Sequence, residues 1–240
     1  EAQINYLKKL RKAGDKPLVL VLTGGSPITL PDEVLELVDA ALFIWYPGEE
    51  GGHAVADVIF GDVSPSGRLP LTFPASLDDL PPYEDYSMQG RTYKFMEKTP
   101  AFPFGFGLSY TTFRYSDLQL DQQELAADGS MQVSVEVTNT GEMASDEVVQ
   151  LYLSYPGSKY EAPLYDLKSF KRVHLKPGET RTVRFNLAGE TVAVYDKEGK
   201  KVHEPGAKTV HVGGSLPGER SRELGAAPVL SANFRMKKVN

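Results

Sequence analysis

The spacing of hydrophobic residues changes once along the sequence, close to residue 111. Before that point, apolar residues come in short continuous runs or at helical spacing. From Thr112 onwards, they alternate with polar residues, which is the period of a half-buried strand. The pattern therefore predicts two domains of different class, one over residues 1–111 and one over residues 112–240.

The first region alternates predicted helices and strands. Residues 1–13 have helical spacing and predict a short helix with a basic outer face. Leu18–Leu22 and Ala40–Trp45 are apolar on both faces, which favours buried parallel strands. Pro31 opens one further helix, and Gly51–Phe60 forms another with an apolar stripe. This order is typical of a mostly parallel α/β domain. Two strands are too few to complete it, so the remaining strands are expected upstream or from another chain.

The second region predicts an all-β fold. Turn signals such as Lys176-Pro177-Gly178-Glu179 divide it into short segments of period two. About seven strands at this spacing indicate an antiparallel β-sandwich of immunoglobulin or fibronectin type. The expected strands are Thr112–Leu120, Met131–Thr138, Glu147–Ser154, Leu164–Leu175, Thr180–Asn186, Val192–Asp196 and Lys208–Gly213.

Composition and charge exclude several classes of function. The formal net charge is −6; residues 1–115 hold 10 Lys/Arg against 15 Asp/Glu, and the remainder hold 16 against 17. Neither region has the basic patch that phosphate backbones require, so nucleic acid is not expected as a partner. No apolar run approaches the roughly 20 residues that span a bilayer. The absence of cysteine excludes disulfides, and the four histidines lack metal-ligand spacing.

The chain begins Glu1-Ala2-Gln3, without an initiator Met or a signal-type apolar stretch. This start is expected to reflect processing or truncation.

A set of ordered motifs resembles glycoside hydrolase family 3, specifically its three-domain β-glucosidases and β-xylosidases. The motifs cover nearly the whole chain in the same order. They are Trp45–Gly52 (WYPGEEGG), Ala56–Asp62 (ADVIFGD), Pro65–Pro70 (PSGRLP), Phe102–Phe113 (FPFGFGLSYTTF), Gln150–Tyr152 and Leu175–Glu179.

The resemblance implies a larger parent enzyme with a barrel, an α/β sandwich domain and a fibronectin type III-like domain. Such enzymes are retaining glycosidases, in which one carboxylate attacks the anomeric carbon and a second carboxyl group acts as acid and base. In this family, the nucleophile lies in the barrel and the acid/base lies before the helix at Glu1–Leu10. Both catalytic carboxylates are therefore expected upstream of Glu1, and no metal or organic cofactor is implied.

Four residues at or near the end of the second apolar run are candidates for a site. Glu49 and Glu50 follow a strand at the carboxyl edge of a parallel sheet, where ligands bind in such folds. They are either an acid/base or sugar-binding pair, or acids that favour the dipole of the helix at Gly51. His53 either contacts carbohydrate or is an ordinary surface residue. Trp45 is either a sugar platform or part of the core.

The irregular segment 75–99 holds the remaining candidates. Tyr86, Arg91 and Tyr93 lie in a stretch without periodicity, and long irregular segments are often functional. Aromatic rings and guanidinium groups can stack on a sugar and bond its hydroxyls. Alternatively, these side chains attach the loop to neighbouring domains.

The resulting hypothesis is the C-terminal portion of an exo-acting β-glucosidase or β-xylosidase that acts on plant oligosaccharides. Its expected partners are the missing barrel portion, in the same or a separate chain, and the oligosaccharide. The substrate class suggests a secreted or periplasmic protein. The alternative is a non-catalytic carbohydrate-binding or scaffolding module, favoured by the sandwich and the absent barrel. Glucose and xylose both remain open.

Overall fold

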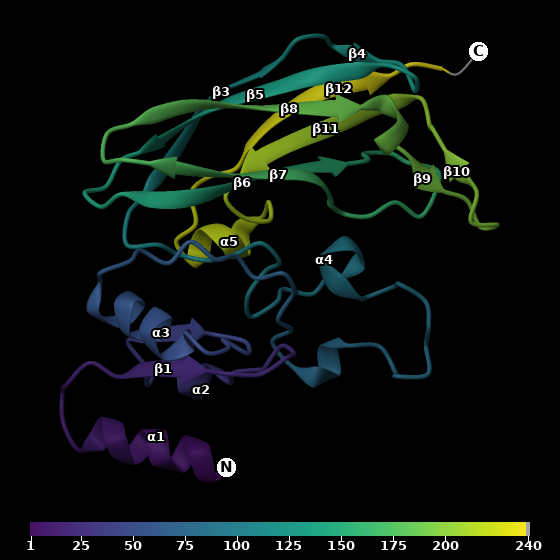
Figure 1. Cartoon of the computed structure of the whole chain (residues 1–240). Coiled ribbons are helices and arrows are strands. Elements are labelled where there is room, and N and C mark those ends of the chain that lie inside the picture. Colours follow the sequence, from purple (N-terminus) through teal and green to yellow (C-terminus); the bar gives the residue numbers. More distant parts are fainter. Residues whose placement is uncertain (239–240) are drawn as a thin grey trace.

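A computed structural model describes residues 1–238 of the chain. Figure 1 shows a β-sandwich lying above a smaller α/β part, with the N-terminal helix farthest from the sandwich. The C-terminal end of the described chain lies at one end of the sandwich. This arrangement confirms the predicted fold class, an α/β part followed by an antiparallel sandwich.

The sandwich has a three-stranded sheet and a five-stranded sheet. The three-stranded sheet has the order β3-β5-β8, and the five-stranded sheet has the order β4-β12-β11-β6-β7. All pairs are antiparallel except β12 with β4. The strands are β3 (Phe113–Leu120), β4 (Glu124–Leu125), β5 (Ser130–Asn139), β6 (Ser145–Ser154), β7 (Asp166–Leu175), β8 (Thr180–Ala188), β11 (Gly206–Gly213) and β12 (Leu230–Met236), with a hairpin of β9 (Val194–Tyr195) and β10 (Lys201–Val202) beside them.

Alternation of apolar residues forms the core of the sandwich. On β5, the side chains of Met131, Val133, Val135 and Val137 point inwards and are fully buried. Strands of the other sheet contribute the facing side chains, among them Leu151. A side-chain period of two thus places one apolar row per strand between the sheets.

The strand predictions hold for most of the sandwich and fail at its end. Six predicted strands match long strands of the structure within two residues at each boundary. Val192–Asp196 is a strand only at Val194–Tyr195, because a 3₁₀ turn (η2, Gly189–Thr191) precedes it. Strand β12 was not predicted, although its apolar residues alternate with polar ones.

The α/β part contains two parallel strands and three helices before residue 61. The elements are α1 (Ala2–Lys12), β1 (Val19–Leu22), α2 (Asp32–Leu35), β2 (Ala40–Phe43) and α3 (Gly51–Phe60). Strand β1 pairs in parallel with β2, with Val19 opposite Ala40. The parallel pairing is therefore as predicted. Pro31 occupies the N-cap of α2 rather than its first turn.

The predicted burial of these strands is wrong for this chain. Val19 and Val21 are 40% and 38% exposed, and Ala40 is also exposed. The apolar stripe of α3 is likewise only half-buried, with Ile59 exposed. The reason is geometric: β1 and β2 pair only with each other, and the described residues supply no further strand beside them.

Two of the four basic residues of α1 depart from the predicted outer face, whereas Lys9 and Lys12 are exposed. Instead of forming an outer face, Arg11 donates to the Leu37 carbonyl oxygen (2.8 Å from Nε) and pairs with Asp39 (2.6 Å). Lys8 pairs with Glu33. These contacts attach α1 to the segment around α2, so the helix uses its charges for packing.

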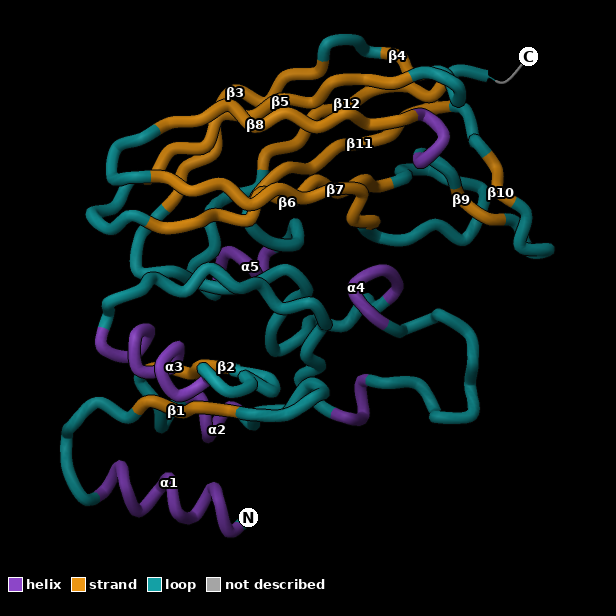
Figure 2. Tube along the Cα trace, in the orientation of Figure 1, coloured by secondary structure: helices purple, strands orange, loops and turns teal. Residues whose placement is uncertain are grey.

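Irregular chain connects the α/β part to the sandwich. Figure 2 shows that loop makes up most of this region, interrupted by short helical turns. These turns are η1 (Leu77–Asp79) and α4 (Thr92–Phe95), and α5 (Glu219–Glu223) approaches them from the sandwich side. Aromatic contacts pack the Phe102–Tyr110 segment, including Phe73 against Phe102 at 6.3 Å between ring centroids.

Candidate functional site

The carboxyl ends of β1 and β2 form one edge of the α/β part. Trp45 follows β2 with a backbone φ of +53°, a region that is uncommon for a bulky residue and costs about 1–3 kcal/mol. Its carbonyl oxygen accepts from the Thr23 hydroxyl and from the Gly24 N–H at 3.3 Å. These bonds bring the loops after the two strands together. The Trp45 ring packs on Phe43 at 4.4 Å, which fits a core role more than an open sugar platform.

Tyr46 lies over the loop after β1 and was missed by sequence analysis. A side-chain carbon at Gly25 would come within 2.9 Å of its ring, so glycine permits this approach. Tyr46 is nevertheless 78% exposed at the edge where ligands bind in parallel sheets. The signal was available: an aromatic residue directly follows an apolar run at Trp45, opposite a Gly-Gly turn.

Glu50 and His53 form a surface pair at the start of α3. The Glu50 carboxylate lies 2.7 Å from Nδ1 of His53, and both side chains are more than 80% exposed. Glu50 occupies the N-cap position, but its side chain makes no capping hydrogen bond. Glu49 is exposed beside it. Within the described residues, solvent therefore surrounds the side chains of all three predicted residues.

Arg91 organises the irregular loop. Its Nη2 donates to the carbonyl oxygens of Pro82 (2.9 Å) and Asp85 (2.6 Å). The Asp85 side chain in turn accepts from the Ser87 N–H at 2.8 Å, which closes a local turn and lowers the pKa of that carboxyl group. Arg91 thus holds the loop backbone in one conformation.

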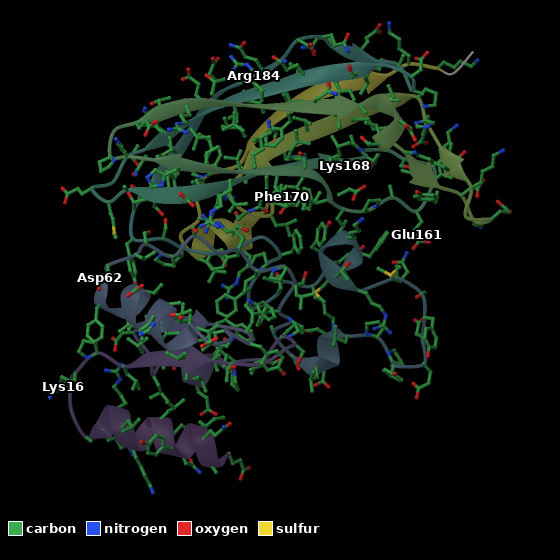
Figure 3. The ribbon with its side chains drawn as sticks, viewed as in Figure 1. Lys16, Asp62, Glu161, Lys168, Phe170 and Arg184 are labelled. Carbon is green, nitrogen blue, oxygen red and sulfur yellow. The ribbon has the colours of Figure 1, made fainter. Side chains whose placement is uncertain are left out.

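The held loop presents two tyrosines to solvent. Tyr83 and Tyr86 are 85% and 88% exposed, so both rings have open faces. Only Tyr86 was a predicted candidate. The Gln89 side chain bonds to Glu161, which Figure 3 labels beside this loop, and so ties the loop to the segment before β7.

Tyr93 packs between the loop and the sandwich. Its ring stacks on Phe104 at 4.1 Å and meets Tyr152 edge-on at 6.2 Å. Its hydroxyl accepts from the Leu167 N–H at 3.4 Å. Burial raises the pKa of the Tyr93 hydroxyl. These contacts match the alternative in which the residue attaches the loop to a neighbouring domain.

A charged cluster reinforces the same junction. Asp166 at the start of β7 pairs with Lys94 of α4 at 2.8 Å and with Lys168 of β7. Burial alone would raise the pKa of Asp166, but the hydrogen bonds from the two lysines outweigh it and lower the pKa. Figure 3 labels Lys168 on β7, above the loop region. The cluster joins α4 to the sandwich.

A buried ion pair forms a second junction. Arg68 pairs with Glu147 on β6, and their side chains are only 8% and 3% exposed. Nε of Arg68 also donates to the Gly214 carbonyl oxygen at 3.2 Å, and the Tyr115 hydroxyl donates to Glu147 at 2.6 Å. Burial raises the pKa of Glu147, although the Arg68 charge and both hydrogen bonds oppose the rise. Sequence analysis noted the Ser-Gly-Arg motif but gave Arg68 no role.

The structure thus separates the predicted residues into two groups. Glu49, Glu50 and His53 share the start of α3, whereas Tyr86, Arg91 and Tyr93 belong to the irregular loop. Among the described residues, no hydrogen bond or ion pair joins the groups. Within residues 1–238, no cluster of three His, Asp or Glu side chains is placed to hold a metal ion, and no helix is long and apolar enough to cross a membrane.

Family profiles match both parts of this two-part fold. Residues 1–110 match the C-terminal domain of glycosyl hydrolase family 3. Residues 147–216 match a fibronectin type III-like domain. The chain therefore belongs to glycosyl hydrolase family 3, as the ordered motifs predict.

Named relatives agree with this assignment. The chain is 44% identical over 218 residues to a β-xylosidase of Formosa agariphila, with 89% of this chain and 30% of the relative covered. It is 41% identical over 214 residues to the periplasmic β-glucosidase of Salmonella typhimurium, with 84% and 28% covered.

Solved structures give the same result. The β-glucosidase of Listeria innocua in complex with glucose superposes with a TM-score of 0.82 at 31% identity. It is covered over 33% of its length by 99% of this chain. The chain thus spans about a third or less of the proteins that it matches here.

Proposed function

We propose that this chain is the C-terminal portion of a retaining, exo-acting β-glucosidase or β-xylosidase that removes non-reducing-end residues from plant oligosaccharides. The main support for this proposal is that both domains match β-glucosidases and β-xylosidases, in the same order, across nearly the whole chain. The proposed division is residues 1–111 for the α/β part and residues 112–240 for the sandwich.

A second part of the proposal is that the chain alone does not hydrolyse glycosides. A retaining mechanism needs two carboxyl groups roughly 5–5.5 Å apart, one of them with a raised pKa. Glu50, the best-placed local candidate, is exposed and paired with His53. The catalytic pair therefore belongs to the barrel and to the segment that precedes Glu1 in the longer relatives.

The proposed contribution of this chain is to shape the substrate site. Arg91 fixes the loop, and Tyr86 is the predicted candidate with an open ring face. An aromatic ring of this kind stacks on a sugar through its apolar face. Under this proposal, Tyr86 touches the oligosaccharide, while Arg91 and Tyr93 position the loop.

The test is hydrolysis of chromogenic β-glucosides and β-xylosides by two polypeptides. One is this chain, and the other is the chain extended at its N-terminus by the barrel portion. We expect turnover only from the extended polypeptide, and the preferred glycoside then identifies the sugar. Turnover by the 240 residues alone would contradict the proposal, as would an inert extended enzyme.

Glu50→Gln in the extended enzyme tests one of the two local carboxylate candidates, the other being Glu49. Removing a general acid/base costs about 10²–10⁴-fold in rate and alters the pH profile. We expect less than a threefold change and an unaltered profile of kcat/KM against pH, because Glu50 is surrounded by solvent. A large loss with a lost basic or acidic limb would make Glu50 the acid/base. Glu198→Gln, on an exposed turn, is the matched control.

The proposed location is the periplasm or the exterior of the cell, as the substrate class suggests. One relative is named as periplasmic. Fractionation of the producing cell tests this location.

A further inference from the structure

A cavity of about 500 Å³ lies at the junction of the irregular loop and the sandwich. Its wall comes from four separate segments: the chain at Thr72, the loop 93–103, the residues before β7, and the chain at residues 216–223. Figures 1 and 2 show α4 and α5 on this side of the sandwich, between it and the α/β part. Its volume lies within the range of small-molecule sites.

The wall of this cavity is already fixed by contacts within the chain. Tyr93 is held by its stack on Phe104. The Leu164 N–H donates to the Lys94 carbonyl oxygen at 2.7 Å, which ties two segments of the wall together. Arg220 donates from Nε and Nη2 to the Ala101 carbonyl oxygen, each at 3.2 Å. A ligand would therefore enter a preformed site, without the cost of ordering it.

The charges of the wall disfavour an anionic ligand. Its two cations are engaged, Arg220 with Glu223 at 3.1 Å and Lys98 with Asp79 at 3.1 Å. Glu97 and Glu219 also line the cavity and make no ion pair within the described residues. The free polar groups of the wall include these two carboxylates and the buried Thr72 hydroxyl, which has no partner within the described residues. Acceptors predominate among them, which favours a ligand that donates hydrogen bonds.

The rest of the wall is apolar and aromatic. Tyr93 and Tyr165 contribute rings, and Pro100, Pro103 and Pro217 contribute further apolar surface. Tyr165 is half-buried and braced edge-on against His211 at 5.4 Å. Aromatic surface together with carboxylate acceptors is the combination that binds a pyranose, which has apolar C–H faces and a rim of hydroxyl donors.

We propose that this cavity binds a neutral mono- or disaccharide, with Tyr165 against the sugar face and Glu97 and Glu219 accepting its hydroxyls. The choice of a sugar over another hydrogen-bond donor rests on the proposed glycosidase function. All the residues that line the cavity within the described structure belong to this chain, so the 240-residue chain is the polypeptide to test.

Calorimetric titration of the 240-residue chain with cellobiose and xylobiose tests the inference. We expect saturable binding of at least one disaccharide. Tyr165→Ala and Glu219→Ala should each weaken binding about tenfold. The first substitution removes the apolar contact with the sugar face, and the second removes a hydrogen-bond acceptor for its hydroxyls. Tyr6→Ala on α1 and Glu198→Ala are the matched controls and should bind like the unaltered chain. Glu219 is exposed, so its variant is expected to fold even if Tyr165→Ala does not.

Three results would overturn the inference: no saturable binding of either disaccharide, binding that both cavity variants leave unchanged, or tighter competing binding of spermidine or glucose 6-phosphate. The outcome is separable from that of the hydrolysis test. An active extended enzyme whose C-terminal chain binds no disaccharide refutes only the cavity proposal. Binding that depends on Tyr165 and Glu219, together with an inert extended enzyme, refutes only the glycosidase proposal.

Discussion

Arg68 and Glu147 show how single residues join the two parts of the chain. Each is almost fully buried, and each neutralises the other. The Glu147 carboxylate also accepts from Tyr115, and Arg68 donates to the Gly214 carbonyl oxygen, so most of their polar atoms are satisfied. Such a pair adds little stability compared with a hydrophobic replacement of both residues. Removing one partner alone is costly, because the other charge stays buried without a compensating group.

Arg68→Ala is therefore expected to destabilise the chain by about 3–5 kcal/mol. The double variant Arg68→Met with Glu147→Leu should recover most of that loss, since neither buried charge remains. Denaturant unfolding of the two variants and the unaltered chain measures the difference. Equal losses in the single and the double variant would show that packing, rather than the unpaired carboxylate, sets the cost.

Asp166 gives the chain an acid-sensitive contact. Its folded-state pKa is lowered, so the unfolded state binds more protons than the folded state as the pH falls, and stability falls with it. The contribution is fully present above the ordinary aspartate pKa of about 4 and is lost as the pH drops through the lower folded-state value. Asp166→Asn should be less stable near pH 7 and should lose less stability between about pH 5 and pH 2.

Asp15→Asn is the matched control, because Asp15 makes no ion pair within the described residues. Thermal unfolding across that pH range is the measurement. A curve for Asp166→Asn parallel to that of the unaltered chain would contradict the prediction.

At the level of elements, the sequence predicts what depends on local pattern. Strand β5 follows directly from its alternating valines, and the parallel pairing of β1 with β2 follows from two apolar runs separated by a helix. Burial of β1 could not be predicted, because it depends on whether other strands cover it. The alternation of β12 could have been detected. The strand was overlooked because it contains several polar residues and is separated along the sequence from the other predicted strands.

The candidate site was likewise only partly predictable from the sequence. The irregular stretch rich in aromatic residues is a loop that Arg91 holds, but sequence alone could not tell which side chains face outwards. Arg91 donates from Nη2 to two backbone carbonyl oxygens and Tyr93 packs against Phe104, whereas the ring of Tyr86 remains exposed. Those roles depend on contacts between segments far apart in sequence, as with Gln89 and Glu161.

Gly105 shows how closely the connecting segment approaches β6. It has a φ of +74°, and a side-chain carbon there would lie 2.2 Å from Oε1 of Gln150 and 2.6 Å from the Tyr152 hydroxyl. Gly157 has a similar φ of +70° but open space around it. Both substitutions to alanine incur backbone strain of about 1–2 kcal/mol. Gly105→Ala also overpacks a junction, which adds about 1–3 kcal/mol.

We therefore expect Gly105→Ala to be the more destabilising of the pair by that additional amount. Denaturant unfolding of the two variants isolates the clash from the backbone strain, because the strain is common to both. Equal effects would mean that the connecting segment can move away from β6 at little cost.

Across the whole molecule, the apolar core is unevenly distributed. The continuous core of the sandwich is built by residues from Phe113 to Met236. Before residue 111, buried hydrophobic side chains are few and scattered: Leu30, Val34, Phe73, Met96, Ala101 and Phe106. Apolar burial is the main favourable term in folding, so the two parts should differ in their ability to fold alone.

Residues 112–240 alone are expected to unfold in one cooperative transition, whereas residues 1–111 alone should show none. Separation also removes Arg68 from Glu147, so the carboxylate loses its cation and keeps the hydrogen bond from Tyr115. The isolated sandwich should consequently gain stability from Glu147→Gln, the opposite of the effect of the same substitution in the intact chain, where it would leave Arg68 unpaired. Calorimetry on five polypeptides measures both effects: residues 1–111, and residues 112–240 and the intact chain each with and without Glu147→Gln. A cooperative transition in residues 1–111, or a loss on Glu147→Gln in the isolated sandwich, would show that the α/β part has a core of its own or that Glu147 has another partner. The reversal in sign would show that Arg68 compensates the charge of Glu147 only while the two parts are joined.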